Sequence, residues 1–204
     1  MNDNPPTDPF RRGSDFAANA CIGYQRSFGE LSQHYRRSAD ALVEAAMRDS
    51  GTLDVHVFSI CFLFRQCIEL ELKEDLWMTE YARTGRKIYI DEVNGAHKRH
   101  ELRPIWDRFR ESAMQLLDSD FPLTDADTRY IDDFLDAWTR HDKQSYAFRY
   151  PISLKKGERP LAGLTNVNLV DLQAGVHHTL ELLGQVMYFV SYLVDERLEY
   201  RGDD

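Results

Sequence analysis

Apolar residues recur three or four positions apart in five segments of the chain, the spacing that places them on one face of a helix. The segments cover about residues 28–51, 53–81, 101–117, 124–140 and 168–198. This pattern predicts an all-α, up-and-down bundle of about five helices, forming a single domain over residues 16–204.

Two stretches between these segments lack the periodic pattern, and we expect irregular excursions from the bundle there, at about residues 82–99 and 141–167. Within the first, RKIYID has the composition of a short strand, and NG marks a turn. Residues 1–15 contain three prolines and no periodicity, so we expect them to form a disordered tail.

The second segment is the most hydrophobic, because its first half is apolar on every side, and we expect it to be the central helix of the bundle. Arg65, Glu69 and Lys73 follow four positions apart and form one stripe on this helix. An unpaired buried charge is costly, so each of the three needs a partner. Two interpretations stay open: a salt-bridge ladder near a helix end, or a polar cluster that several segments build inside the bundle.

Charge and cysteine content narrow the classes of function. The net charge is −9 and the pI is near 5.3, which argues against binding nucleic acid by non-specific phosphate contacts over a basic surface. Cys21, Cys61 and Cys67 form no CxxC pair and are interpreted as reduced thiols of a cytoplasmic protein. The longest apolar run is about ten residues, roughly half of what a membrane-spanning helix needs, so no membrane association is expected.

The segment HDKQSYAFRYPIS, residues 141–153, is expected to be a loop, yet it is rich in aromatic and ionisable side chains. Tyr146, Phe148 and Tyr150 alternate with Ala147 and Arg149, and an extended backbone would place Arg149 opposite the three rings. One interpretation is a loop that its rings hold against the bundle, with Arg149 in solvent. The other is that Arg149 joins the polar cluster.

Three motifs, in this order, resemble those of the HEPN family. QCIELELKEDL at residues 66–76 is similar to the family's helix motif, HEL at residues 100–102 to its His-Asp-Leu at a helix start, and FRYP at residues 148–151 to its Arg-Tyr-Pro segment. The resemblance spans about residues 53–198. It implies a four- or five-helix bundle, often dimeric, of prokaryotic toxin–antitoxin and phage-defence systems.

The resemblance also implies a choice of functions. Some HEPN proteins are metal-independent ribonucleases, whereas others bind nucleotides or act as partners of nucleotidyltransferases. The ribonucleases carry an Arg followed, after four to six residues, by a His at the start of the last helix, and this motif is absent here. The implied function is therefore a nucleotide- or RNA-binding regulatory component of a stress or defence module, with a nucleotidyltransferase or antitoxin as partner. A divergent ribonuclease toxin and a purely structural dimerisation bundle are the alternatives.

The candidate ligand-binding cluster combines the charged stripe with ionisable residues of the other two motifs and of the loop. Its members are Arg65, Glu69, Lys73, His100, Asp142 and Arg149. Glu69 is expected within salt-bridge reach of Arg149 or Lys73, because a buried carboxylate requires a base nearby.

Neither a metal nor another cofactor is expected, since His97, His100 and Glu101 only loosely resemble a metal-ligand spacing and a fourth ligand is not evident. The last helix carries nearly three apolar stripes, more than packing against one side of a small bundle requires. Large apolar side chains left in water would form an unusual patch. We therefore predict a homodimer formed largely through this helix.

Overall fold

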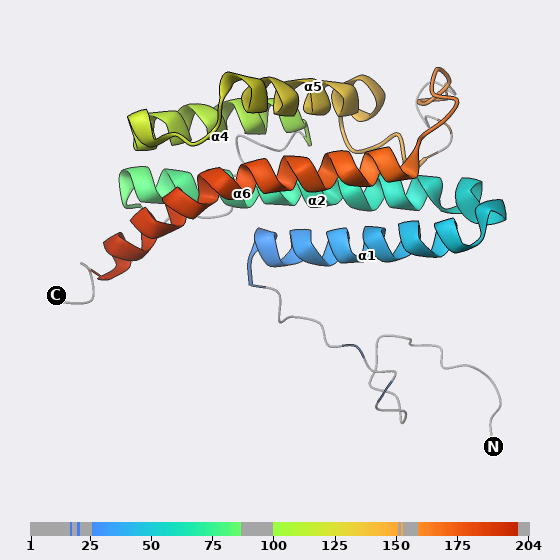
Figure 1. Cartoon of the computed structure of the whole chain (residues 1–204), viewed down its shortest axis with the longest axis horizontal. Coiled ribbons are helices and arrows are strands. Elements are labelled where there is room, and N and C mark those ends of the chain that lie inside the picture. Colours follow the sequence, from blue (N-terminus) through green and yellow to red (C-terminus); the bar gives the residue numbers. More distant parts are fainter. Residues whose placement is uncertain are drawn as a thin grey trace.

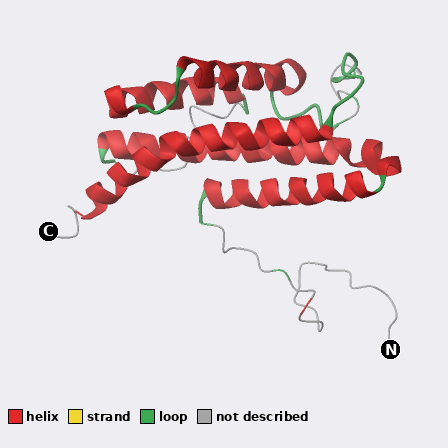
Figure 2. Cartoon of the chain, viewed as in Figure 1, coloured by secondary structure: helices red, strands yellow, loops and turns green. Residues whose placement is uncertain are grey.

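The computed structural model describes residues 17, 20, 26–86, 100–150, 152 and 159–199. These residues contain helices and loops but no strand, as Figure 2 shows, so the predicted all-α bundle is confirmed. The helices are α1 (Phe28–Arg48), α2 (Leu53–Thr84), α4 (Leu102–Leu117), α5 (Asp125–Asp142) and α6 (Leu169–Glu199), with short 3₁₀ turns η2 (Ser50–Thr52) and η3 (Asp118–Asp120). The predicted tail at residues 1–15, Cys21, His97 and the strand candidate after Arg86 lie outside the described residues.

The helices form layers around α2. Figure 1 shows α2 and α6 side by side in the middle of the molecule, with α1 on one side and α4 and α5 on the other. Ile60, Phe64, Ile68 and Leu72 of α2 have no exposed surface. The second hydrophobic segment is thus the central helix, as its all-round apolar pattern predicts.

Helix directions decide which residues meet. Glu69 lies against His100, and Glu80 accepts a hydrogen bond from Ser112, so α4 runs in the same direction as α2. Figure 1 shows that α6 also runs in this direction, whereas α1 and α5 run the opposite way. The start of α6 therefore lies beside the start of α2, at one end of the bundle.

The helix ends follow from local chemistry. Thr124 caps α5 in a capping box with Asp127. The predicted end of α2 near Tyr81 is three residues short, because Gly85 adopts a left-handed conformation with φ 67° and donates its N–H to the carbonyl of Tyr81. The helix α5 likewise extends past the predicted end, to Asp142.

Close approach of α5 and α6 depends on a glycine. A Cβ atom at Gly175 would lie only 2.7 Å from the ring of Phe134. The missing side chain therefore lets α6 pack directly against the aromatic face of α5.

The structure also bears on two further expectations, the state of the cysteines and the presence of a membrane-spanning helix. Cys61 and Cys67 are buried free thiols. Within the part of the chain that the structure describes, no helix combines the length and the hydrophobicity needed to cross a bilayer.

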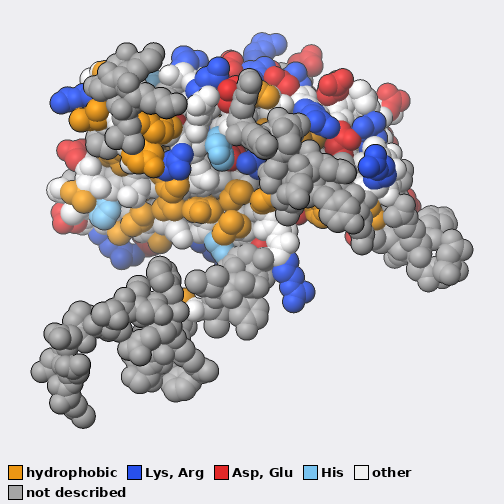
Figure 3. Space-filling view, turned by 180° about the vertical axis from the view of Figure 1, so that it is seen from behind, with side chains coloured by type: hydrophobic (Ala, Val, Ile, Leu, Met, Phe, Trp, Pro, Cys, Tyr) orange, Lys and Arg blue, Asp and Glu red, His pale blue; other side chains and the backbone are white. Residues whose placement is uncertain are grey.

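Hydrophobic side chains stay at the surface in two places. Tyr188, Phe189 and Tyr192 of α6 are 75%, 40% and 63% exposed and, with the end of α4, they line a groove. At the other end of the bundle, Phe58 and Val170 are similarly exposed and line a cleft. Figure 3 shows hydrophobic side chains as a band along the back of the molecule, and as a cluster near Lys or Arg side chains at its left end.

Candidate functional site

The charged stripe of α2 forms a network in the interior of the protein. One guanidinium nitrogen of Arg65 lies 3.1 Å from Oε2 of Glu69, and Nζ of Lys73 lies 2.6 Å from Oε1 of the same carboxylate. Arg65 and Glu69 are 0% and 2% exposed, so this is no surface ladder. The expectation that Glu69 lies within salt-bridge reach of Arg149 or Lys73 is confirmed for Lys73.

His100 closes the network from the other side. Its Nδ1 lies 2.7 Å from Oε1 of Glu69, and its backbone carbonyl accepts a hydrogen bond from the second terminal nitrogen of Arg65. His100, two residues before α4 begins, is thereby attached to α2 through both its ring and its backbone. The predicted meeting of Arg65, Glu69, Lys73 and His100 is found in the structure.

The surrounding charges keep the Glu69 carboxylate ionised. Burial alone raises the pKa of Glu69, but Lys73, Arg65 and His100 outweigh it and hold that pKa below the usual range. An ionised carboxylate only accepts hydrogen bonds, so the proton of a neutral His100 ring lies on Nδ1. Nε2 of His100 is then the lone-pair nitrogen, on a side chain that is 53% exposed.

Asp142 is buried, but it plays a different part from the one predicted. Its Oδ1 accepts hydrogen bonds from the backbone nitrogens of Tyr146, at 2.6 Å, and Ala147, at 2.9 Å. Among the described residues, its Oδ2 has no hydrogen-bond partner, and neither has Nε of Arg65. Asp142 thus organises the loop that follows α5, and no direct ion pair joins it to Arg65 there.

Asp142 still influences the interior by its charge. Burial lowers the pKa of Arg65, while Glu69 and Asp142 act against this effect. Burial and the charge of Asp142 together raise the pKa of the Cys61 thiol to about 12. Cys61 is therefore a neutral core residue, with none of the thiolate character that a nucleophile requires.

Arg149 is the predicted cluster member that the structure places elsewhere. It is exposed, and its guanidinium carbon lies 5.9 Å from the ring centre of Phe62 and 5.7 Å from that of Tyr150. No ion pair between Arg149 and Glu69 is found among the described residues. The loop interpretation with Arg149 in solvent is the one that the structure supports.

The backbone of this loop explains the position of Arg149. Ser145 has φ 55°, and the N–H of Arg149 bonds the carbonyl of Tyr146, so the segment forms turns and no extended strand. Phe148 packs edge-on between Phe58 and Trp138. The three rings therefore do not share one face, which the alternating pattern would require.

Two contacts that the sequence pattern did not indicate hold the loop on α2 and α4. Gln66 donates a hydrogen bond of 2.5 Å to the hydroxyl of Ser145, and Lys143 lies 3.8 Å from the carboxylate of Glu101. The loop and the His100 motif thus lie next to each other on one side of α2.

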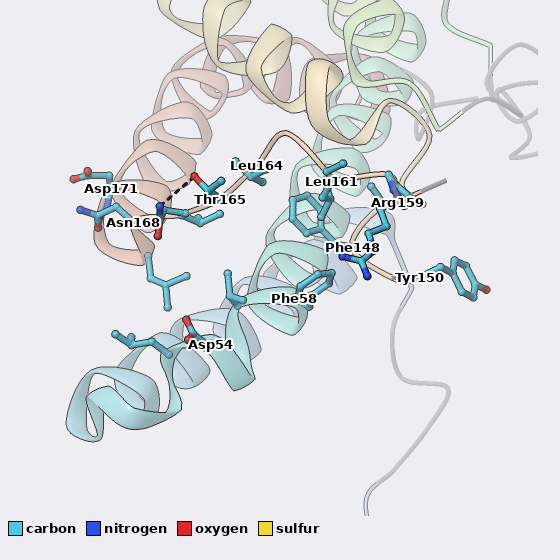
Figure 4. A pocket seen from close by; sticks show the side chains of 18 of the residues that line it. Asp54, Phe58, Phe148, Tyr150, Arg159, Leu161, Leu164, Thr165, Asn168 and Asp171 are labelled. Carbon is cyan, nitrogen blue, oxygen red and sulfur yellow. Dashed lines mark hydrogen bonds between the residues drawn. The ribbon is translucent and has the colours of Figure 1, made fainter. Parts of the chain in front are cut away.

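A cleft of about 1090 Å³ opens beyond Phe148, between the starts of α2 and α6 and the segment that precedes α6 (Figure 4). Phe58, Phe148 and Tyr150 contribute to its lining, and Arg159 lies at the same side as Phe148. Sequence reasoning missed this cleft, because its walls come from segments that only the tertiary fold brings together.

No metal site emerges from the described residues, where no group of three or more His, Cys, Asp and Glu side chains is placed to hold an ion. Comparison of the chain with protein-family models, with curated proteins and with solved structures gives no match. Proposals on function therefore depend on the geometry and on the motif resemblance alone.

Proposed function

We propose that this chain is a HEPN-like nucleotide- or RNA-binding component that regulates a prokaryotic stress or defence module. One observation supports it above all: the three motifs of the resemblance lie together on α2. Glu69 of the first motif bonds His100 of the second, and Phe148 and Arg149 of the third pack on Phe58 and Phe62.

The surface beside the network has groups suited to a single-stranded ligand. Arg149 offers a positive charge, with the rings of Phe62 and Tyr150 next to it, and the rings of Tyr146 and Tyr150 are 4.8 Å apart. Aromatic rings stack on unpaired bases, and arginine contacts phosphate. Arg65 and Glu69 are buried in the interior, so they position His100 and do not contact the ligand themselves.

A binding assay with labelled single-stranded RNA and with free nucleotides tests the proposal. Arg149→Ala should weaken binding roughly three- to tenfold, because it removes one exposed cationic contact worth on the order of 1 kcal/mol. Arg37→Ala, at an exposed position on α1, is the matched control and should bind normally. Equal affinity of both variants, or no binding of any nucleotide or RNA by the wild type, would refute the proposal.

A divergent metal-independent ribonuclease is the second candidate, and the Glu69–His100 pair favours it. A carboxylate that holds Nδ1 of a half-exposed imidazole leaves Nε2 able to take a proton from a 2′-hydroxyl. Cleavage of RNA in the presence of chelator that His100→Gln abolishes, with RNA binding retained, would establish this candidate. Absence of cleavage by the wild type would leave the binding function.

We also propose that the functional unit is a homodimer and that its partner is a nucleotidyltransferase or an antitoxin. The exposed rings of Tyr188 and Phe189 support the dimer, since soluble monomers rarely leave such groups in water. A purely structural dimerisation bundle is the third alternative. The same face of α6 would then form the dimer, and Arg149→Ala would change only local packing.

A further inference from the structure

The cleft at the start of α2 and α6 has the size of a small-molecule site. Its volume of about 1090 Å³ lies at the upper end of the usual range for ligand pockets. Apolar side chains line much of it, and several of them are left partly in water, including Phe58 at 43% and Val170 at 50%. An apolar body that covered these side chains would be stabilised by the area it buries.

Charge is distributed unevenly around the cleft. Arg159 lies beside Phe148 at one side, and no ion-pair partner for it is found in the part of the chain that the structure describes. Asp54 and Asp171 lie at the opposite side, in the first turns of α2 and α6. A helix N-terminus carries about half a positive charge, which offsets only about half the charge of each of these carboxylates. Among the described lining residues, the cleft is therefore cationic at Arg159 and weakly acidic at the opposite side.

Hydrogen-bonding capacity is concentrated at the acidic side. Asn168 accepts the backbone N–H groups of Val170 and Asp171 with its side-chain oxygen, which leaves its NH₂ group for a ligand. The carboxylates of Asp54 and Asp171 are acceptors for hydroxyl or amine groups. The two ends of the cleft thus differ: one end is cationic and aromatic, and the other is weakly acidic and rich in hydrogen-bonding groups.

We infer that this cleft binds a small amphipathic ligand with a flat aromatic body and an anionic group, the anion at Arg159 and the ring system over Phe58 and Phe148. The inference does not rest on the proposed strand-binding surface, although both use the same loop. Phe148 and Tyr150 line the cleft, whereas Arg149 between them lies over Phe62 on α2. A nucleoside phosphate and an aromatic carboxylate both have this chemistry.

The test uses 8-anilinonaphthalene-1-sulfonate, an aromatic anion whose fluorescence rises in apolar sites, and N-phenyl-1-naphthylamine, its uncharged counterpart. We expect saturable binding of the sulfonate with one site per chain. Arg159→Gln should weaken the sulfonate roughly three- to tenfold and leave the uncharged probe unaffected, because only the ion pair is lost.

Variants that fill the cleft with a larger side chain show where the probe binds. Ala162→Trp and Val170→Trp replace exposed lining residues, so they should fold normally, which a thermal melt checks, and should lower sulfonate affinity about tenfold or more. Val55→Trp, exposed on α2 outside the lining, and Tyr188→Ser in the groove of α4 and α6 are the controls and should bind as wild type.

Loss of probe binding in Tyr188→Ser with retention in both tryptophan variants would place the probe in the other groove and overturn the inference. Absence of saturable binding would also overturn it. Adenosine monophosphate and indole-3-acetate are then used as competitors: displacement by one identifies the source of the ligand, and displacement by neither contradicts the inferred chemistry. None of these outcomes affects the RNA assay with Arg149→Ala, so the two proposals fail separately.

Discussion

Oδ1 of Asp142 lies 2.6 Å from the backbone nitrogen of Tyr146, so the last residue of α5 fixes the loop that follows it. The same oxygen accepts the N–H of Ala147, and both bonds are shielded by burial of the carboxylate. The position of Arg149, three residues beyond Tyr146, therefore depends on Asp142, which is not itself part of the proposed binding surface.

Asp142→Ala should release this loop. The backbone nitrogens of Tyr146 and Ala147 lose a buried acceptor, at a cost of about 1–3 kcal/mol each in unfolding free energy. Hydrogen exchange of these two amides should accelerate, while Asp142→Asn, which keeps an acceptor oxygen, should retain more protection. Unchanged exchange in Asp142→Ala would show that the loop is held by its rings alone; Asp133→Ala, exposed on α5, is the control.

Glu69→Ala should destabilise the protein by roughly 3–5 kcal/mol, because it leaves the buried charges of Arg65 and Lys73 without their carboxylate. Urea unfolding measures the loss. Glu44→Ala removes an exposed carboxylate paired with Arg48 and should cost well under 1 kcal/mol. Similar unfolding curves for the two variants would contradict an interior network.

Asp75 should make stability depend on pH. Burial, and then the charges of Glu71 and Glu74, raise its pKa well above the usual range, while the unfolded chain titrates near about 3.9. The folded state thus holds a proton that the unfolded state releases, so this residue lowers stability as pH rises from the unfolded pKa to the folded one.

Asp75→Asn removes that dependence. The variant should gain unfolding free energy relative to wild type at neutral pH and show a smaller difference near pH 4, measured by urea unfolding across this range. Some pH dependence should persist, since burial also raises the pKa of Glu71 and Glu74. A parallel pH profile for the variant and the wild type would refute the assignment.

Light scattering tests the predicted dimer. The chain has a mass of 23.8 kDa, and we expect a particle of about twice this mass at micromolar concentration. Tyr188→Glu combined with Phe189→Glu should restore the monomer, because charges on the exposed face oppose its burial. A wild-type mass equal to one chain would contradict the dimer.

The sequence predicted the network well because its geometry is local. Arg65, Glu69 and Lys73 are four residues apart on one helix, and helical periodicity alone brings them together. His100 followed only from its place in a motif, since the chain between α2 and α4 has no periodic pattern to place it. Contacts between helices depend on packing that no single segment encodes.

Arg149 shows where pattern reasoning failed. Alternation of rings suggests an extended backbone, but the left-handed Ser145 and the capped amides after Asp142 turn the chain instead. Neither residue type demands that conformation by itself. The cleft was beyond prediction for a related reason: its walls come from α1, α2, α6 and the loop segments before α6, and only the tertiary fold brings these together.

The two exposed hydrophobic surfaces lie far apart along α6. Val170 lines the cleft and Tyr188 the groove, and eighteen residues of helix separate them by about 27 Å. Pairing through the groove would leave both clefts open, because the cleft and the groove share no lining residue. Such an assembly is bivalent: a partner that carries two aromatic anionic groups and reaches both clefts would bind with a higher effective concentration than either cleft provides alone.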